Sequence, residues 1–141
     1  MKNKVCIITG ASGGIGSAIA EALFNAGFKL VLIGRNEEKL KKVANGRDCL
    51  IIPGDILDDN FIKYAVEKTV EVYGGIDVLI NNAGIAHYGL LSMTDEATWD
   101  RLFDVNVKGI YHCVNAAMPA FLASERPPFS LSCLAPPSPL P

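Results

Sequence analysis

Short apolar runs alternate with longer amphipathic stretches through the first 124 residues of this 141-residue chain. The apolar runs are four or five residues long and are bounded by Gly, Asn or Asp, which is typical of strands buried on both faces. They read VCIIT, LVLIG, CLII and DVLIN, at residues 5–9, 30–34, 49–52 and 77–81. A stretch with helical spacing follows each run. This alternation predicts an α/β fold with a parallel sheet and right-handed crossovers.

Helix boundaries and one long helix can also be predicted from the pattern. Glycine in the segments 25–28 and 45–46 marks two helix ends, and Asp58 and Asp59 precede the third helix as capping residues and partners of its dipole. Apolar residues recur every three or four positions in the last helix, which predicts one continuous apolar face. That face consists of Trp99, Phe103, Val107, Ile110, Val114, Ala117 and Phe121.

The end of the chain has a different composition. Six of its eight prolines lie in the last fifteen positions, and no charged residue follows Arg126. Because proline lacks the donor that a central strand needs, we expect residues 1–124 to form the domain and residues 125–141 to stay outside the sheet. The strand at 77–81 would then be an unprotected edge. A frameshift, retained intron or alternative terminal exon would explain the abrupt change, with a native disordered tail as the alternative.

The glycine-rich stretch IITGASGGIGSAIAEAL carries the most chemistry. It follows a predicted strand and opens a helix, and Gly10, Gly14 and Gly16 form the pattern T-G-x-x-x-G-x-G. Glycines permit positive φ and let a pyrophosphate approach the backbone, where it would lie on the N–H groups at the start of the helix. The predicted ligand is a dinucleotide, and a tight turn without a ligand is the alternative.

With this turn the sequence resembles the short-chain dehydrogenase/reductase family. Three further segments carry the resemblance, GDI at 54–56, NNAG at 81–84 and FDVNVKG at 103–109. Together the motifs cover about residues 2–124. The resemblance implies a Rossmann-like, doubly wound sheet with strand order 3-2-1-4, incomplete because later strands are missing. It also implies an oxidoreductase that transfers hydride between NADP(H) and an alcohol or ketone.

The resemblance implies a set of cofactor-binding residues at the carboxyl ends of the strands. Asp55 would bond the adenine amino group, or else be a loop acid without a ligand, and NNAG would adjoin the nicotinamide ribose, with an ordinary turn as the alternative. The set is Thr9, Gly10, Ser12, Gly14, Ile15, Gly16, Arg35, Asp55, Ile56, Asn82, Ala83 and Gly84.

In dinucleotide-binding folds, the residue that contacts the 2′ position of the cofactor ribose normally lies about 20 positions after the glycine-rich turn. Here the sequence is Gly34-Arg35-Asn36, without an acid. An acid there would accept the 2′-OH of NAD, whereas the guanidinium of Arg35 suits the 2′-phosphate of NADP. We therefore expect NADP(H) to be preferred, with NAD(H) as the alternative cofactor and a solvated arginine as the alternative role.

Only one member of the family's catalytic set is matched. Asn106 shares the expected buried face of the last helix; in the family the matching Asn lies in a locally disturbed helix and holds a water of the proton relay. The alternative is an asparagine that lies in the core with all its hydrogen bonds made within the protein.

The family's Tyr-x-x-x-Lys is absent at its expected place, although Ser132 or Cys133 lies near the position of the family's catalytic serine. Tyr64 and Lys68 have the spacing but lie in the third helix, away from the expected nicotinamide site.

Composition narrows the classes of partner. The formal net charge of −2 and pI near 5.6 argue against nucleic acid, and no apolar span reaches bilayer length. The four cysteines form no CxxC pair, so a zinc site is not expected, and reduced thiols indicate a cytoplasmic protein.

We expect little catalytic turnover from this chain alone. The alternatives are a non-catalytic NADP-binding module and an interaction product that pairs through the helix at 99–122 with a full-length subunit.

Overall fold

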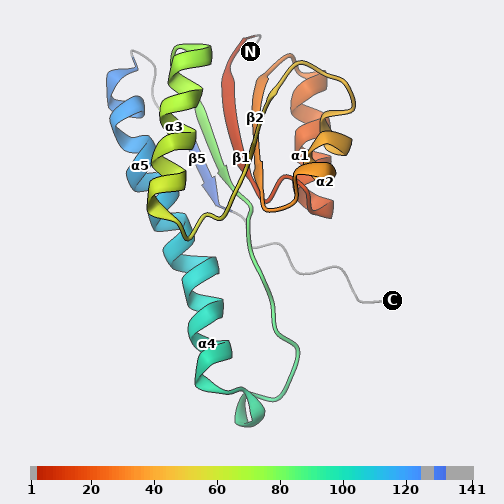
Figure 1. The fold of residues 1–141 in the computed structure, drawn as a ribbon, viewed down its shortest axis with the longest axis vertical. Coiled ribbons are helices and arrows are strands. Elements are labelled where there is room, and N and C mark those ends of the chain that lie inside the picture. Colours follow the sequence, from red (N-terminus) through yellow and green to blue (C-terminus); the bar gives the residue numbers. More distant parts are fainter. Residues whose placement is uncertain (1–2, 125–128, 133–141) are drawn as a thin grey trace.

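A central parallel sheet lies between two layers of helices (Figure 1). The computed structural model describes residues 3–124 and 129–132. Helices α1 (Gly14–Asn25) and α2 (Glu37–Ala44) cover one face of the sheet, and α3 (Asp59–Tyr73) and α5 (Gly109–Ala123) cover the other. The predicted α/β class is confirmed.

The strands have the order β3-β2-β1-β4-β5, and each pairs in parallel with its neighbours. The first four are β1 (Val5–Thr9), β2 (Lys29–Gly34), β3 (Leu50–Pro53) and β4 (Val78–Asn81). These are the four predicted apolar runs, and their order 3-2-1-4 is confirmed. Because both faces are covered by helices, the central strands β1 and β2 are buried along almost their whole length.

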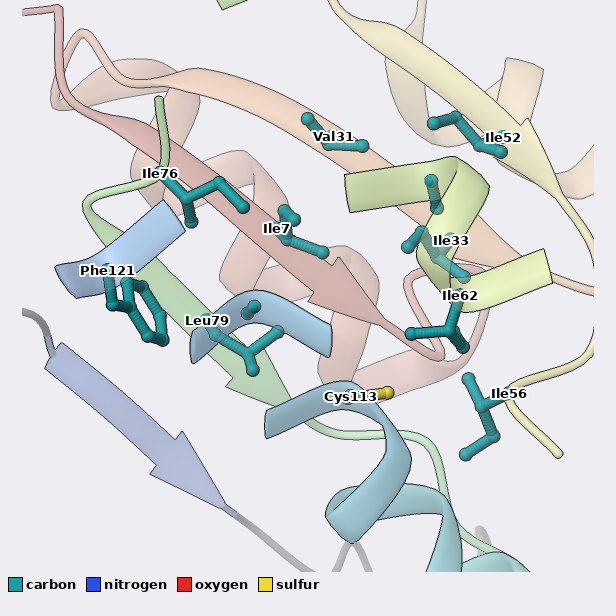
Figure 2. Close-up of a cluster of buried hydrophobic side chains, with 12 residues drawn as sticks. Ile7, Val31, Ile33, Ile52, Ile56, Ile62, Ile76, Leu79, Cys113 and Phe121 are labelled. Atoms are coloured by element: carbon teal, nitrogen blue, oxygen red, sulfur yellow. The ribbon is translucent and has the colours of Figure 1, made fainter. Parts of the chain in front are cut away.

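Alternate side chains of the strands enter two separate cores. Ile7, Val31 and Leu79 lie in the core on the α3 and α5 side, together with Cys113 and Phe121 of α5 (Figure 2). Cys6, Ile8, Leu30 and Leu32 point into the core beneath α1 and α2. Burial raises the pKa of the Cys6 and Cys113 thiols to about 12, so both remain protonated at neutral pH and act as small apolar side chains.

Helix caps follow the sequence signals. The Asp58 carboxylate accepts hydrogen bonds from the backbone N–H groups of Asn60 and Phe61 at the start of α3. Helix α2 ends at Ala44, directly before the Asn-Gly pair that marks its end, and Asn45 adopts the left-handed conformation with φ of 48°. Capping of α3 by Asp58 and the predicted end of α2 are therefore confirmed.

A fifth strand corrects the prediction for the end of the chain. Strand β5 (Phe129–Ser132) pairs in parallel with β4, from Val78↔Phe129 to Asn81↔Ser132. The expectations that residues 125–141 stay outside the sheet, that later strands are missing and that β4 is an edge are thus wrong at these four residues. Residues 129–132 contain no proline, so each keeps the backbone N–H group that a strand beside β4 needs for pairing. Residues 125–128 and 133–141, including Cys133, lie outside the described residues.

The predicted long helix is divided into three parts. A π-helical segment, η2 (Asp104–Lys108), separates α4 (Glu96–Phe103) from α5. A π-turn changes the helical phase, and α4 extends past the end of the sheet where no layer covers it (Figure 1). The expected continuous buried face is therefore wrong at Trp99, Phe103 and Val107, which are 45, 50 and 56% exposed. It holds at Ala117 and Phe121, which are buried.

Among the described residues, no helix combines the length and the apolar character needed to cross a membrane.

Replacing Phe121 by alanine tests the packing of α5 on the sheet. Its ring is 4% exposed and lies among core side chains of β1, β4 and α5 (Figure 2). We expect Phe121→Ala to lower the free energy of unfolding by about 3–5 kcal/mol, measured by urea denaturation. Leu122, 78% exposed on the same helix, is the matched control, and Leu122→Ala should change stability by less than about 0.5 kcal/mol. Equal losses for the two variants would contradict the observed burial.

Candidate functional site

A groove of about 340 Å³ lies where the carboxyl ends of β1 to β4 meet. It is lined by the β1–α1 turn, the ends of β2 and β3, the segment after β4, and two residues of α4 and η2. All of the sequence-predicted cofactor-binding residues except Thr9 line it. They are Gly10, Ser12, Gly14, Ile15, Gly16, Arg35, Asp55, Ile56, Asn82, Ala83 and Gly84.

Two glycines of the turn are required by close packing inside the protein. Gly10 has φ of 64°, and a Cβ there would lie 2.7 Å from the Cα of Ala83. A Cβ on Gly16 would overlap the carbonyl oxygen of Gly10 and lie 2.7 Å from Nδ2 of Asn82. Conformation and space therefore both exclude a side chain at Gly10, and space alone excludes one at Gly16. These two glycines bring the turn, α1 and the end of β4 together as one wall of the groove.

A buried hydrogen-bond network joins the ends of β1 and β4. Oγ1 of Thr9 accepts bonds from the backbone N–H groups of Asn82 and Ala83, each at 3.1 Å, and donates to the carbonyl of Ile80 at 3.4 Å. Nδ2 of Asn82 donates to the carbonyls of Thr9 and Gly10 at 3.1 and 3.0 Å. Thr9 is 1% exposed and lies behind the groove. Its hydroxyl positions the wall and does not line the groove.

The start of α1 is open toward the groove. Its N-cap is Gly13, no side chain caps it, and its first turn carries no acidic residue. By contrast, Asn36, Asp58 and Asp95 cap α2, α3 and α4 with side-chain oxygens. The first N–H groups of a helix have no intrahelical acceptor and carry the positive end of its dipole. The groove thus presents an uncapped, positively polarised helix end that can accept an anion.

Basic and acidic side chains lie at separate points of the groove. Arg35 is exposed at the end of β2, and no acidic side chain of the described residues forms an ion pair with it. The neighbouring Asn36 is engaged as the cap of α2. Oδ1 of Asp55 accepts a bond from the N–H of Leu57 at 3.0 Å, and the residue is exposed. The side chain of Ile56 turns into the core (Figure 2), so this residue lines the groove chiefly through its backbone.

Asn106 lies in the π-helical segment, as the resemblance to a locally disturbed helix implied. Its Oδ1 accepts a bond from the N–H of Ile85 at 2.9 Å, and its Nδ2 donates to the carbonyl of Ile85 at 2.8 Å. Both bonds hold the segment after β4 against η2. Asn106 itself does not line the groove.

The Tyr64–Lys68 pair, which has the family's Tyr-x-x-x-Lys spacing, lies outside the groove. Tyr64 is 54% exposed on α3, and Nζ of Lys68 lies 2.9 Å from Oε2 of Glu71. Neither residue lines the groove.

Other lining residues were missed by the sequence analysis. Arg101 of α4 and Val105 of η2 reach the groove, as do Leu57, Ile85 and Ala86. For Arg101 and Val105, the sequence shows only that they are four positions apart and so share one face of a helix. That spacing does not reveal which face turns toward the sheet, because the π-turn changes the phase.

Replacing Thr9 by valine tests the network between β1 and β4. Valine keeps the shape of the side chain but removes the hydroxyl oxygen that accepts from the N–H groups of Asn82 and Ala83. The Asn82 N–H also donates to the carbonyl of Ile80 at 3.2 Å, so the loss falls chiefly on Ala83. We expect Thr9→Val to cost about 1–3 kcal/mol of unfolding free energy in urea denaturation. Thr9→Ser keeps the hydroxyl and should retain most of that stability. Equal losses in the two variants would assign the effect to the methyl group and contradict the network.

Comparison with known proteins assigns the family. The short chain dehydrogenase family model matches residues 4–127. An uncharacterised oxidoreductase of Listeria monocytogenes is 40% identical over 130 residues, which cover 89% of this chain and 52% of the relative. The chain thus spans about half the length of the curated relatives it matches.

Solved structures agree with the sequence match. A 3-ketoacyl-(acyl-carrier-protein) reductase from Brucella melitensis, complexed with NADH, superposes with a TM-score of 0.81 at 32% identity, over 85% of this chain and 51% of that one. An alcohol dehydrogenase from the archaeon Thermococcus sibiricus, complexed with 5-hydroxy-NADP, has a TM-score of 0.85 at 28% identity, over 93% and 57%. The glycine turn, the strand order and the family match together show that this chain belongs to the short-chain dehydrogenase/reductase family of oxidoreductases.

Proposed function

We propose that this chain is the cofactor-binding half of a short-chain oxidoreductase and that it binds NADP(H) in preference to NAD(H). The observation that carries the proposal is the combination of the uncapped start of α1 with Arg35 in one groove. No acid follows β2 at the position that would accept a ribose 2′-OH, since Arg35 and Asn36 stand there. A groove with this charge arrangement favours a dinucleotide that carries an additional phosphate.

Each part of the groove has a role in this proposal. The N–H groups at Gly14, Ile15 and Gly16 bind the pyrophosphate, with Ser12 beside them, and Arg35 binds the 2′-phosphate. Asp55 and Ile56 border the adenine, while Asn82, Ala83 and Gly84 adjoin the nicotinamide ribose. Thr9 and Gly10 hold the wall in shape. The bound cofactor supplies hydride transfer to or from an alcohol or ketone, which is the activity we propose for the whole protein.

We further propose that these 141 residues bind the cofactor with little or no turnover. Asn106 is the one catalytic position matched, and its amide is engaged with the backbone of Ile85. Tyr64 and Lys68 do not line the groove, and proton transfer to a substrate needs hydrogen-bond reach, so we assign this pair no catalytic role.

Replacing Arg35 by glutamine tests the cofactor preference. We expect Arg35→Gln to weaken NADPH binding by about tenfold and to change NADH binding by less than about twofold, since only NADPH carries the 2′-phosphate. Both affinities are measured by fluorescence titration. Arg47→Gln removes the same charge outside the groove and should change neither affinity.

The same titration distinguishes the alternatives. Gly14→Asp places a carboxylate at the start of α1 and should abolish binding of both cofactors. Saturable binding without turnover supports a cofactor-binding module. Absence of binding by the unsubstituted chain would overturn the proposal and favour an interaction product. A loss on Arg35→Gln that is equal for NADPH and NADH would contradict the assigned role of Arg35.

A second candidate function is pairing with another subunit through the helical region at 99–122. Apolar side chains lie exposed along α4, η2 and α5, including Trp99, Phe103, Val107 and Tyr111. Exposed apolar side chains on successive turns of a helix are typical of a protein interface. We propose that this surface mediates self-association or pairing with a longer subunit.

Introducing a charge on this surface tests the second candidate. We expect the chain to self-associate at micromolar concentration and Phe103→Glu to shift it to monomer in sedimentation velocity, because a buried carboxylate without a partner is costly. Tyr64→Glu on α3 is the matched control, since Tyr64 is 54% exposed and Phe103 50%. A monomeric unsubstituted chain, or equal effects of the two variants, would contradict the pairing.

A further inference from the structure

Arg101 is a positive charge at the groove for which the proposed cofactor contacts give no role. It lies in the last turn of α4 and lines the groove together with Val105, four residues later in η2. The acidic residue at helical spacing from it, Asp104, pairs instead with Lys108, with 3.7 Å between Oδ1 and Nζ. Among the described residues, no ion pair involves Arg101. The guanidinium is therefore available to a ligand.

The helix that carries Arg101 has little other attachment to the protein. No residue of α4 is buried, and the helix extends away from the sheet and from α1 and α2 (Figure 1). Val105, by contrast, packs against the core cluster that contains Ile56. Arg101 thus lies one helical turn before a residue that packs against the core, and both line the groove. A ligand held by Arg101 would connect α4 to the groove.

We propose that Arg101 binds the adenosine half of the dinucleotide and thereby orders α4 when the cofactor is bound. This inference rests on the proposed function. The adenosine half is favoured because Val105, which lines the groove with Arg101, packs against the core cluster that contains Ile56, and Ile56 lies between Asp55 and Leu57 at the proposed adenine side of the groove. A guanidinium there stacks on a purine or pairs with a phosphate of that half.

The charge of the groove agrees with this assignment. Its lining contains three formally charged side chains, which are Arg35, Asp55 and Arg101. The groove lining therefore has a formal net charge of +1, and it would be neutral without Arg101 because the charges of Arg35 and Asp55 cancel. An anionic dinucleotide therefore meets a complementary field from two sides of the groove.

Calorimetric titration with NADP⁺ and with 2′,5′-ADP, which is the adenosine half alone, tests the contact. We expect Arg101→Gln to weaken both ligands by about two- to fivefold, as for an exposed guanidinium contact, and Arg101→Lys to recover part of the loss. Arg47→Gln is the matched control because Arg47 stacks on Phe24 outside the groove, and it should leave both affinities unchanged.

The outcomes separate this inference from the proposed function. If the unsubstituted chain binds neither ligand, both fail together. If it binds both and Arg101→Gln binds them equally well, the inference alone fails. A loss for NADP⁺ without a loss for 2′,5′-ADP would place the contact outside the adenosine half and would also overturn it.

Hydrogen–deuterium exchange at saturating 2′,5′-ADP tests the ordering of α4. We expect exchange at residues 96–103 to slow when ligand binds the unsubstituted chain, and to slow much less in Arg101→Gln at equal saturation. Trp99, the single tryptophan of the chain, lies in α4 against Phe103 with ring centroids 4.9 Å apart and reports the same event by fluorescence. Equal slowing in both proteins would show that Arg101 does not connect the helix to the ligand.

Discussion

The hydrogen bonds between the ends of β1 and β4 determine where the rest of the groove lies. Thr9 and Asn82 exchange contacts through backbone and side chain, so the turn after β1 cannot move independently of the segment after β4. The glycines at 10 and 16 permit this close approach, because a Cβ at either would collide with the opposite element. The start of α1 is thereby fixed beside the nicotinamide end of the proposed site.

The uncapped start of α1 can bind an anion because it lies in the groove. Side chains cap the starts of α2, α3 and α4, but the start of α1 lies in a groove with glycine as its N-cap. Its N–H groups therefore remain available in a place where water can be replaced by an anion. In the proposed function, the charged side chains around this point select the dinucleotide; they lie directly after β2, shortly after β3 and in α4.

Most of the sheet and most of the groove could be predicted because they follow local rules. The four apolar runs specify buried strands, and Asp58 and the Asn-Gly pair at 45–46 specify helix boundaries. Two parts depend on longer-range effects that the spacing of residues does not reveal, although the resemblance implied a disturbed helix at Asn106. The strand Phe129–Ser132 pairs because β4 offers an open edge, which outweighs the proline-rich composition around it. The π-turn at 104–108 alters the helical phase, so Trp99 and Phe103 lie outside the core and the approach of Arg101 to the groove could not be derived from spacing.

The parallel pairing of β1 with β4 also has a consequence for how the chain folds. In this pair Cys6 lies opposite Val78, so more than half of the chain is synthesised between the two partners. Strands β1 and β2 are separated by a single helix and form an early local unit, whereas closing β4 against β1 carries the larger loop-closure entropy. The groove is therefore completed late, and a nascent chain acquires its ligand-binding surface only after the fourth strand has docked.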